Sequence, residues 1–239
     1  MSSVSQDLDR QGGRTSHTRG LTLLALRRWV GATLLLGLLL FLPAGTFDYW
    51  EAWVYMAILL LPALVVLLVG VRTDPELIER RMRMKEKEPE QQRIVRYGTM
   101  LFPLAFVIPG LDQRFGWSVV PPPAVIAADL LIFLGYLLFV RVMKENRYAS
   151  RIVEVEQAQR LITTGPYALV RHPMYVAVLL IYTLSPLALA SYWGLAISGW
   201  FIPLLIARIR SEEKILARDL SGYIEYTSKT RFRLIPGIW

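Results

Sequence analysis

The run from Met174 to Ala207 is 34 residues long and contains no charged side chain. One helix needs about 20 apolar residues to cross a hydrocarbon core about 30 Å thick. The run is therefore too long for one span and suits a tight hairpin of two, with Pro186, Ser191 and Gly194 offering breaks. Together with a hydrophobic content of 54% and a mean hydropathy of +0.39, it predicts a membrane protein rather than a soluble globule.

Four further apolar runs precede this hairpin. They cover residues 29–44, 53–71, 97–111 and 124–140, and with the hairpin they predict an all-α polytopic bundle of about six transmembrane helices. At about 1.5 Å per residue the third run reaches only about 22 Å, which is short for a full span. Two interpretations of this run stay open: its helix begins nearer Ile94, or it only dips into the bilayer.

Positive charge is distributed unevenly between the two sides of the predicted bundle. The stretches 1–28, 72–96, 141–171 and 208–239 hold 5, 8, 6 and 7 of the 27 Lys and Arg residues, and the opposite side holds only Arg114. Because positive loops stay in the cytoplasm, we expect both termini and the active site to face the cytoplasm of an inner or plasma membrane. The net charge of +8 then faces anionic lipid head groups and indicates no nucleic-acid partner.

The same boundaries divide the chain into three parts. We expect a disordered cytoplasmic tail over 1–28, transmembrane helices over 29–140 and a functional core over 141–239. The second part contains the charged loop 72–96, in which Asp74-Pro75 has the pattern of a helix start. It also contains Asp129, an acid inside an apolar run. Such an acid is a functional candidate by position, and for Asp129 we expect a structural partner.

The residue inventory excludes several common chemistries. The chain has no cysteine, and its two histidines are His17 in the tail and His172, so no metal site is expected. It lacks the G-x-G-x-x-G pattern of dinucleotide folds, the P-loop pattern and the G-x-S-x-G elbow. Carboxylates and tyrosine rings in the polar stretches favour a bound cation, and arginines suit an acidic group. These residues indicate transfer chemistry with a charged organic cofactor.

Three segments carry a family resemblance. GPYALVRHPMY, EEKIL and GYIEYTSKTRFRLIPGIW, in this order around the apolar hairpin, resemble the isoprenylcysteine carboxyl methyltransferase family and its bacterial relatives. Phospholipid N-methyltransferases share parts of the pattern. The resemblance implies a membrane methyltransferase that uses S-adenosylmethionine and lacks a soluble Rossmann-like domain. It also implies a lipid or prenylcysteine-like acceptor that enters from the bilayer. The first 140 residues carry no recognised motif.

The resemblance assigns roles to residues of the functional core. The residues implied for cofactor binding are His172, Tyr175, Glu213, Glu212, Gly165, Tyr167 and Asn146. The residues implied for catalysis or for orienting the acceptor are Arg171, His172, Glu213, Arg208 and Arg231. No metal is implied. The methyl group is expected to pass directly from the sulfonium to an acceptor oxygen, nitrogen or sulfur, and only an amine acceptor needs Glu or His as a base.

Other interpretations stay open beside this one. Arg171-His172-Pro173 is also a plain helix start at the head groups, and Glu212 lies one helix turn from Arg208 and suits a surface ion pair. At the level of function, a sterol-reductase-like enzyme that uses NADPH and a non-enzymatic transporter or scaffold are the alternatives. Neither the methyl acceptor nor the oligomeric state follows from the sequence.

Overall fold

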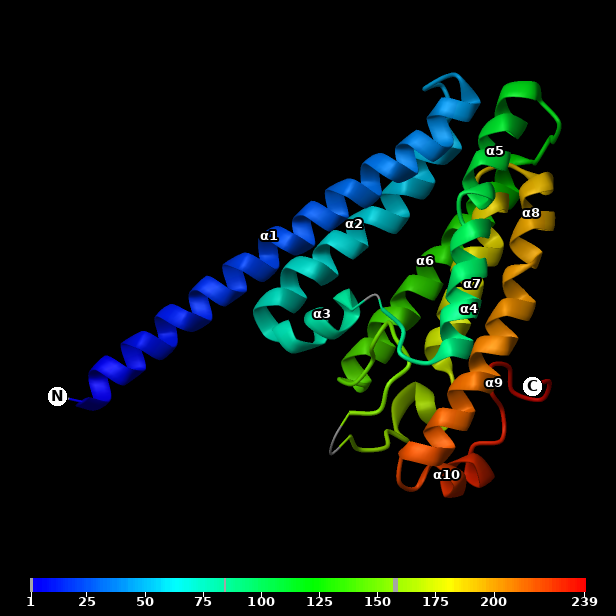
Figure 1. Cartoon of the computed structure of the whole chain (residues 1–239). Coiled ribbons are helices and arrows are strands. Elements are labelled where there is room, and N and C mark those ends of the chain that lie inside the picture. The colour runs from blue at the N-terminus through cyan, green and yellow to red at the C-terminus, as the bar shows by residue number, and fades with distance from the viewer. Residues whose placement is uncertain (1, 84, 157–158) are drawn as a thin grey trace.

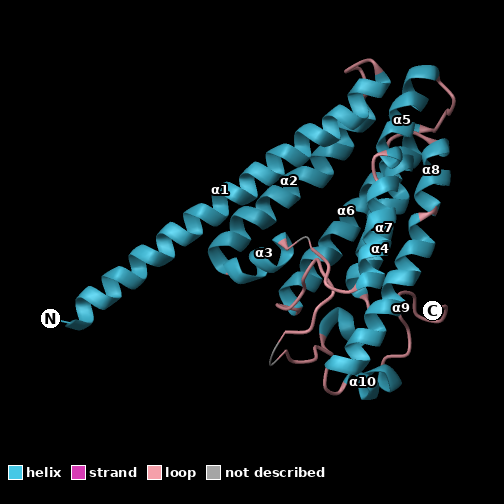
Figure 2. Ribbon diagram, in the orientation of Figure 1, coloured by secondary structure: helices cyan, strands magenta, loops and turns pink. Residues whose placement is uncertain are grey.

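The computed structural model describes residues 2–83, 85–156 and 159–239, with side chains described from residue 18 onward. Every regular element in this part of the chain is a helix (Figures 1 and 2). The elements are α1 Ser2–Ala44, α2 Trp50–Thr73, α3 Pro75–Met82, α4 Pro89–Leu101, α5 Leu104–Phe115, α6 Pro122–Glu145, the 3-10 helix η1 Gly165–Ala168, α7 Pro173–Ala188, α8 Tyr192–Gly199, α9 Phe201–Asp219 and α10 Tyr223–Lys229.

The membrane-spanning architecture expected from the apolar runs is confirmed. Five helical segments of the described chain are long and apolar enough to cross a membrane: Thr18–Ala44, Trp50–Thr73, Pro89–Phe115, Pro122–Glu145 and Tyr192–Asp219. The apolar helix α7 is shorter, and its 16 residues reach about 24 Å. The hairpin is present, since α7 and α8 reverse direction at residues 189–191.

The structure decides between the two interpretations left open for residues 97–111. It is a full-length segment, Pro89–Phe115, made of α4 and α5 with a break at Phe102 and Pro103. It therefore begins even earlier than Ile94. The charged residues near its start lie at the polar end of the bundle, where they extend the helix without entering its apolar part.

Helix α1 differs from the expected disordered tail. Its backbone is helical from Ser2, across the stretch 1–28 that we expected to be unstructured. Within that stretch Leu21 is buried against Val71 of α2 and Ile78 of α3. Because this contact buries apolar surface, the helix continues through its basic residues instead of beginning after them. The division of the chain into three functional parts stays a prediction.

The connections between the spans gather at two ends of the bundle (Figure 1). Short turns at residues 45–49, 116–121 and 189–191 lie at one end. The polar connections 74–88 and 146–172 lie at the other, with both termini and α10. This arrangement brings the basic stretches of the sequence together at one end, as the charge pattern predicted. That this end faces the cytoplasm stays a prediction.

The core is held by apolar packing and by a few buried polar groups. Tyr49 donates its hydroxyl to the carbonyl oxygen of Leu189 at 2.6 Å, and the Tyr55 hydroxyl lies 2.8 Å from that of Ser185. Asp129 on α6 is 3% exposed, and its carboxylate oxygens have no hydrogen-bond partner among the described residues. The structural partner expected for Asp129 is thus not found in the part of the chain that the structure describes.

We predict that two helical glycines respond oppositely to alanine. A Cβ at Gly110 of α5 would lie 2.6 Å from the Leu40 carbonyl oxygen and 3.0 Å from Pro43 Cβ of α1, whereas a Cβ at Gly98 of α4 meets nothing within 4 Å. Gly110→Ala should destabilise the protein by about 1–3 kcal/mol through overpacking. Gly98→Ala should be neutral or stabilise it by up to about 1 kcal/mol. Thermal unfolding in detergent measures both, and equal effects would contradict the close α1–α5 contact.

Candidate functional site

A cavity of about 790 Å³ lies at the polar end of the bundle, and we call it the central cavity. One part of its wall is apolar and comes from spanning helices: Val95 of α4, Val178 and Tyr182 of α7, and Leu205 of α9. The other part is polar and comes from the connection 146–172, the start of α7 and the second half of α9. Its residues include Asn146, Tyr167, Arg171, His172, Tyr175, Arg208 and Glu212. One space is therefore bounded both by membrane helices and by polar groups.

His172, Tyr175 and Glu212 form one connected group in the polar wall. Because Pro173 begins α7 directly after His172, Tyr175 lies on the first turn of that helix. The His172 ring is buried and stacks on the Tyr175 ring with centroids 5.6 Å apart. The Tyr175 hydroxyl donates to Glu212 Oε2 at 2.5 Å and accepts from Arg208 Nε at 3.0 Å. This tyrosine hydroxyl is thus both donor and acceptor, which fixes its position.

Glu213 lies behind the cavity wall rather than in it. Arg171 Nη1 is 2.9 Å from Glu213 Oε1, Arg233 Nε donates to Oε2 at 2.8 Å, and His172 Nε2 is 3.4 Å from Oε1. Adjacent residues of a helix point about 100° apart, so Glu212 faces the cavity and Glu213 faces the C-terminal segment. These three contacts join Glu213 to Arg171, Arg233 and His172, and the cofactor-binding and catalytic roles expected of Glu213 stay predictions.

Tyr167 and Asn146, both expected to bind the cofactor, lie together in the cavity wall. Asn146 Nδ2 donates to the Tyr167 hydroxyl at 2.9 Å, and the Tyr226 hydroxyl donates to the Tyr167 carbonyl oxygen at 2.7 Å. Burial raises the pKa of Tyr167 to about 12 against the opposing effect of the Asn146 hydrogen bond, so its phenol is neutral at physiological pH.

Gly165, which the resemblance also implied for cofactor binding, is not in the cavity wall. Its backbone has a φ of +58°, in the left-handed region. A Cβ added to this residue would lie 2.7 Å from Glu145 Oε2. The left-handed backbone conformation favours glycine at this position, and the role in cofactor binding expected of Gly165 stays a prediction.

The three predicted arginines have different surroundings. Arg171 is paired with Glu213, and Arg208 Nη2 lies 2.8 Å from Glu86 Oε1. Arg231 is exposed and outside the cavity wall, and only its carbonyl oxygen takes part, accepting from Arg171 Nη2 at 3.2 Å. Two of these guanidinium groups are therefore already neutralised by carboxylates, and the third does not reach the cavity.

Two charged cavity residues come from the loop 72–96 and were not predicted. Glu86 is 5% exposed and accepts hydrogen bonds from Arg208 and, at 3.0 Å, from the backbone N–H of Val153. Arg81 of α3 donates to the carbonyl oxygen of Ser150 at 3.0 Å. The one sequence signal in this loop was the helix start at Asp74, but that signal does not indicate which charges turn inward.

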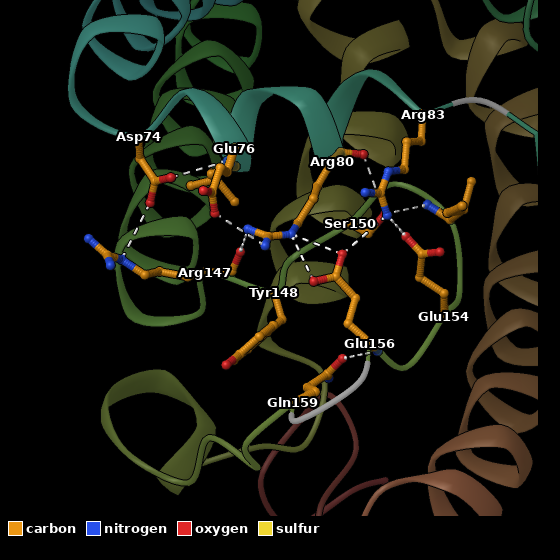
Figure 3. A network of polar contacts seen from close by, with 12 residues as sticks. Asp74, Glu76, Arg80, Arg83, Arg147, Tyr148, Ser150, Glu154, Glu156 and Gln159 are labelled. Atoms are coloured by element: carbon orange, nitrogen blue, oxygen red, sulfur yellow. Dashed lines mark hydrogen bonds and ion pairs between the residues drawn. The ribbon is translucent and has the colours of Figure 1, made fainter. Parts of the chain in front are cut away.

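Helix α3 is fixed over the cavity by ion pairs, which Figure 3 shows. Asp74 caps the helix, since its Oδ1 accepts from the backbone N–H of Leu77 at 3.2 Å, as the Asp-Pro pattern predicted. Arg80 Nε lies 3.0 and 3.1 Å from the two carboxylate oxygens of Glu156. Past the helix, Arg83 pairs with Glu154. These contacts tie α3 to the connection that forms one side of the cavity.

Tyr223 carries a buried polar atom that the fold leaves free. The residue lines the cavity at the start of α10, and its hydroxyl has no hydrogen-bond partner among the described residues. Burial raises the pKa of this phenol, so the hydroxyl keeps its proton. A buried hydroxyl without a partner costs free energy, and a ligand in the cavity would supply the missing hydrogen bond.

Comparison with known proteins finds a family similar to the segment that forms much of the cavity wall. Residues 123–221 match the family model described as phospholipid methyltransferase. The matched segment is 99 of the 239 residues long, about two fifths of the chain. It contains α6, the RHP motif, the hairpin and the Glu212–Glu213 pair, so the resemblance expected from the C-terminal motifs is confirmed. No curated protein shows significant similarity to the sequence.

A comparison of structures finds a similar fold over the whole chain. The structure is similar to that of the eukaryotic intramembrane Ras methyltransferase, isoprenylcysteine carboxyl methyltransferase. The TM-score is 0.56 with 17% sequence identity, over 100% of this chain and 88% of that chain. At this identity the likeness shows a common fold. The N-terminal half, which carries no recognised motif, thus shares the architecture of a methyltransferase of known structure.

We predict that Glu213→Gln destabilises the protein. The substitution leaves the nearly buried Arg171 without its ion-pair partner, and breaking a buried pair from one side costs about 3 kcal/mol. The matched control is Glu225→Gln, which removes an exposed pair with Lys229 and should change stability by less than about 0.5 kcal/mol. Thermal unfolding in detergent compares the two. Equal stability of both variants would show that Glu213 does not hold the site together.

Proposed function

We propose that the protein is an integral membrane methyltransferase that uses S-adenosylmethionine and methylates a lipid or prenylcysteine-like acceptor at the polar end of its bundle. The family match and the fold support the class of methyltransferase. The observation that carries the proposal is the central cavity itself. Its wall combines polar groups that suit a water-borne cofactor with apolar residues of α4, α7 and α9 that suit a hydrophobic chain.

The residues of the polar wall fit S-adenosylmethionine. Glu212 offers a carboxylate, and Tyr167, Tyr175 and Tyr226 offer aromatic surface, and both kinds of group favour a positively charged sulfonium. The unpartnered hydroxyl of Tyr223 offers a hydrogen bond to a polar ligand. When bound, the cofactor supplies a methyl group already activated by the sulfonium.

The protein's own residues then have to position the reactants and exclude water. Arg208 and Glu212 fix Tyr175 from two sides, and the Tyr175 ring supports His172. The buried imidazole is close to both acids, with Nδ1 at 4.0 Å from Glu212 Oε1 and Nε2 at 3.4 Å from Glu213 Oε1. A carboxylate acceptor needs only this positioning, whereas an amine acceptor also needs a base, for which Glu212 and His172 are the residues at hand.

The charge distribution supports a cytoplasmic site. The basic stretches lie at the same end as the central cavity, and positive loops remain in the cytoplasm. We therefore place the active site at the cytoplasmic face of an inner or plasma membrane. There it has access to a soluble cofactor and to a lipid acceptor in the bilayer.

The first test is ligand-dependent stability. S-adenosylmethionine or S-adenosylhomocysteine at 100 times its Kd should stabilise the native protein by about 2.7 kcal/mol. Thermal unfolding of the purified protein in detergent measures the shift, with NADPH at the same concentration as the control ligand. A shift with NADPH and none with the two adenosyl compounds would favour a reductase over a methyltransferase.

Two tyrosines of α10 give a matched test of the cofactor site. Tyr223→Phe removes a hydroxyl without a partner, so stability should be unchanged or slightly higher, while the affinity for S-adenosylhomocysteine should fall about fivefold or more. Tyr226→Phe removes the hydrogen bond to Tyr167 and should cost about 1 kcal/mol of stability. Calorimetric titration and thermal unfolding separate the two effects. Unchanged affinity in Tyr223→Phe would remove that hydroxyl from the cofactor site.

A further inference from the structure

Three half-buried arginines line the central cavity, and they differ in what neutralises them. Arg171 has Glu213 at 2.9 Å, and Arg208 has Glu86 at 2.8 Å. For Arg81, no carboxylate among the described side chains lies within ion-pair distance. Two of the three arginines that the family resemblance marks for the acceptor are thus already paired, while an arginine from the N-terminal half is not.

The contacts of Arg81 are weak ones for a guanidinium. It donates to the Ser150 carbonyl oxygen at 3.0 Å and to Met174 Sδ at 3.4 Å, and it lies 5.0 Å from the centre of the Phe139 ring. These contacts orient the group without neutralising it. An arginine carries five N–H donors, so further donors remain for a ligand.

The arginines on either side of Arg81 in the sequence, Arg80 and Arg83, both have carboxylate partners. Arg80 bonds to Glu156, and Arg83 pairs with Glu154 (Figure 3). Both carboxylates belong to the connection 146–172, and Glu154 also lines the cavity. Arg81 lies against the same connection through Ser150, yet no carboxylate among the described side chains is within ion-pair distance of it. The segment therefore pairs Arg80 and Arg83 and leaves Arg81 without a counter-ion.

A second cation, Arg151, directly follows Ser150, whose carbonyl oxygen accepts from Arg81. Arg151 lines the same cavity, its side chain is exposed, and no carboxylate among the described residues pairs with it. Burial lowers the pKa of Arg81 to about 10, and repulsion by Arg151 acts in the same direction, yet Arg81 stays charged at neutral pH. Two neighbouring cations without a carboxylate are unfavourable, and a bound oxyanion would compensate them.

The two cations stand where the cavity wall changes character. Arg81 donates to Met174 on the first turn of α7, beside Tyr175 of the polar wall, and Tyr182 of the apolar wall lines the same cavity. Tyr182 lies seven residues after Tyr175 on α7, about 10 Å further along the helix. An amphiphile whose chain lies among the apolar residues of α4, α7 and α9 would have its head group at this boundary.

We propose that Arg81, assisted by Arg151, binds the oxyanion of an amphiphilic acceptor, a carboxylate or a phosphate, and so selects acidic lipids as substrates. The proposal rests on the proposed methyltransferase function and deepens it. It makes the N-terminal half of the chain part of acceptor recognition, with Arg81 as a specificity-determining residue and the paired Arg171 and Arg208 as parts of the wall.

Single-chain amphiphiles test this on the full-length protein in a neutral detergent. Hexadecanoate, hexadecyl phosphate and the uncharged hexadecanol serve as probes, and thermal unfolding gives their apparent affinities. The wild type should be stabilised by at least one of the two anions and not by hexadecanol. The anion that acts identifies the head group as carboxylate or phosphate. The proposal would be overturned if hexadecanol stabilised the protein as much as the anions do. It would also be overturned if none of the three compounds stabilised it.

Arg81→Met is the decisive variant. It should weaken the anion response about tenfold or more, because a charge-assisted hydrogen bond is lost, and leave the S-adenosylhomocysteine response intact. Its stability without ligand should not fall, since the substitution removes an uncompensated charge. Arg151→Met should weaken the same response to a smaller extent. Arg93→Met, on the exposed side of α4, removes an equal charge and should change none of these responses.

The outcomes separate this proposal from the function on which it rests. If Arg81→Met loses the S-adenosylhomocysteine response and keeps that to the anion, Arg81 belongs to the cofactor site and the proposal is wrong. If Arg81→Met and Arg151→Met both keep the anion response, it is wrong as well. If the wild type binds anions but neither adenosyl compound, the oxyanion site stands while the methyltransferase function fails.

Discussion

The buried carboxylate of Glu86 is the contact on which the site most depends. It accepts hydrogen bonds from Arg208 on α9 and from the backbone of Val153 in the connection 146–172, while its own segment follows α3. Three stretches far apart in the sequence are thereby joined at one charged group. Arg208 in turn fixes Tyr175, so the geometry of the polar wall follows from an acid in the N-terminal half. The C-terminal motifs therefore do not form the site alone.

The C-terminal segment closes the site from the other side. The backbone N–H groups of Arg171 and His172 donate to the carbonyl oxygens of Phe232 and Arg233 at 2.9 and 3.0 Å. Glu213 adds its ion pairs to the side chains of Arg171 and Arg233. These bonds satisfy the backbone just before α7 begins, where no helix partner exists. The segment thus holds the RHP motif in place while leaving the opposite face of His172 toward the cavity.

The architecture could be predicted from the sequence because a membrane requires long apolar segments separated by polar loops, and both are visible in the sequence. Apolar runs, basic loops and the break at Ser191 depend only on composition along the chain, and the hairpin and the polar end follow from them. The start of α1 was not predicted, since the burial of Leu21 against α2 and α3 is a tertiary contact. The motifs contain Tyr175 and Glu212, which line the cavity, and the roles expected of these two residues stay predictions. They could not show which of two adjacent acids faces inward, and they contain no information on Glu86 or Arg81.

The distribution of counter-ions explains why the unpredicted residues matter. A cavity at the edge of a membrane needs cations to attract acidic ligands, but each cation taken from water costs free energy unless it is paired. The fold pairs the arginines that build its walls, Arg171 and Arg208, and both become rigid parts of the structure. Arg81 is held by a carbonyl oxygen, a sulfur atom and a ring, so it is oriented without being neutralised. Its charge therefore remains directed at the cavity, at the boundary where an acidic head group would meet it.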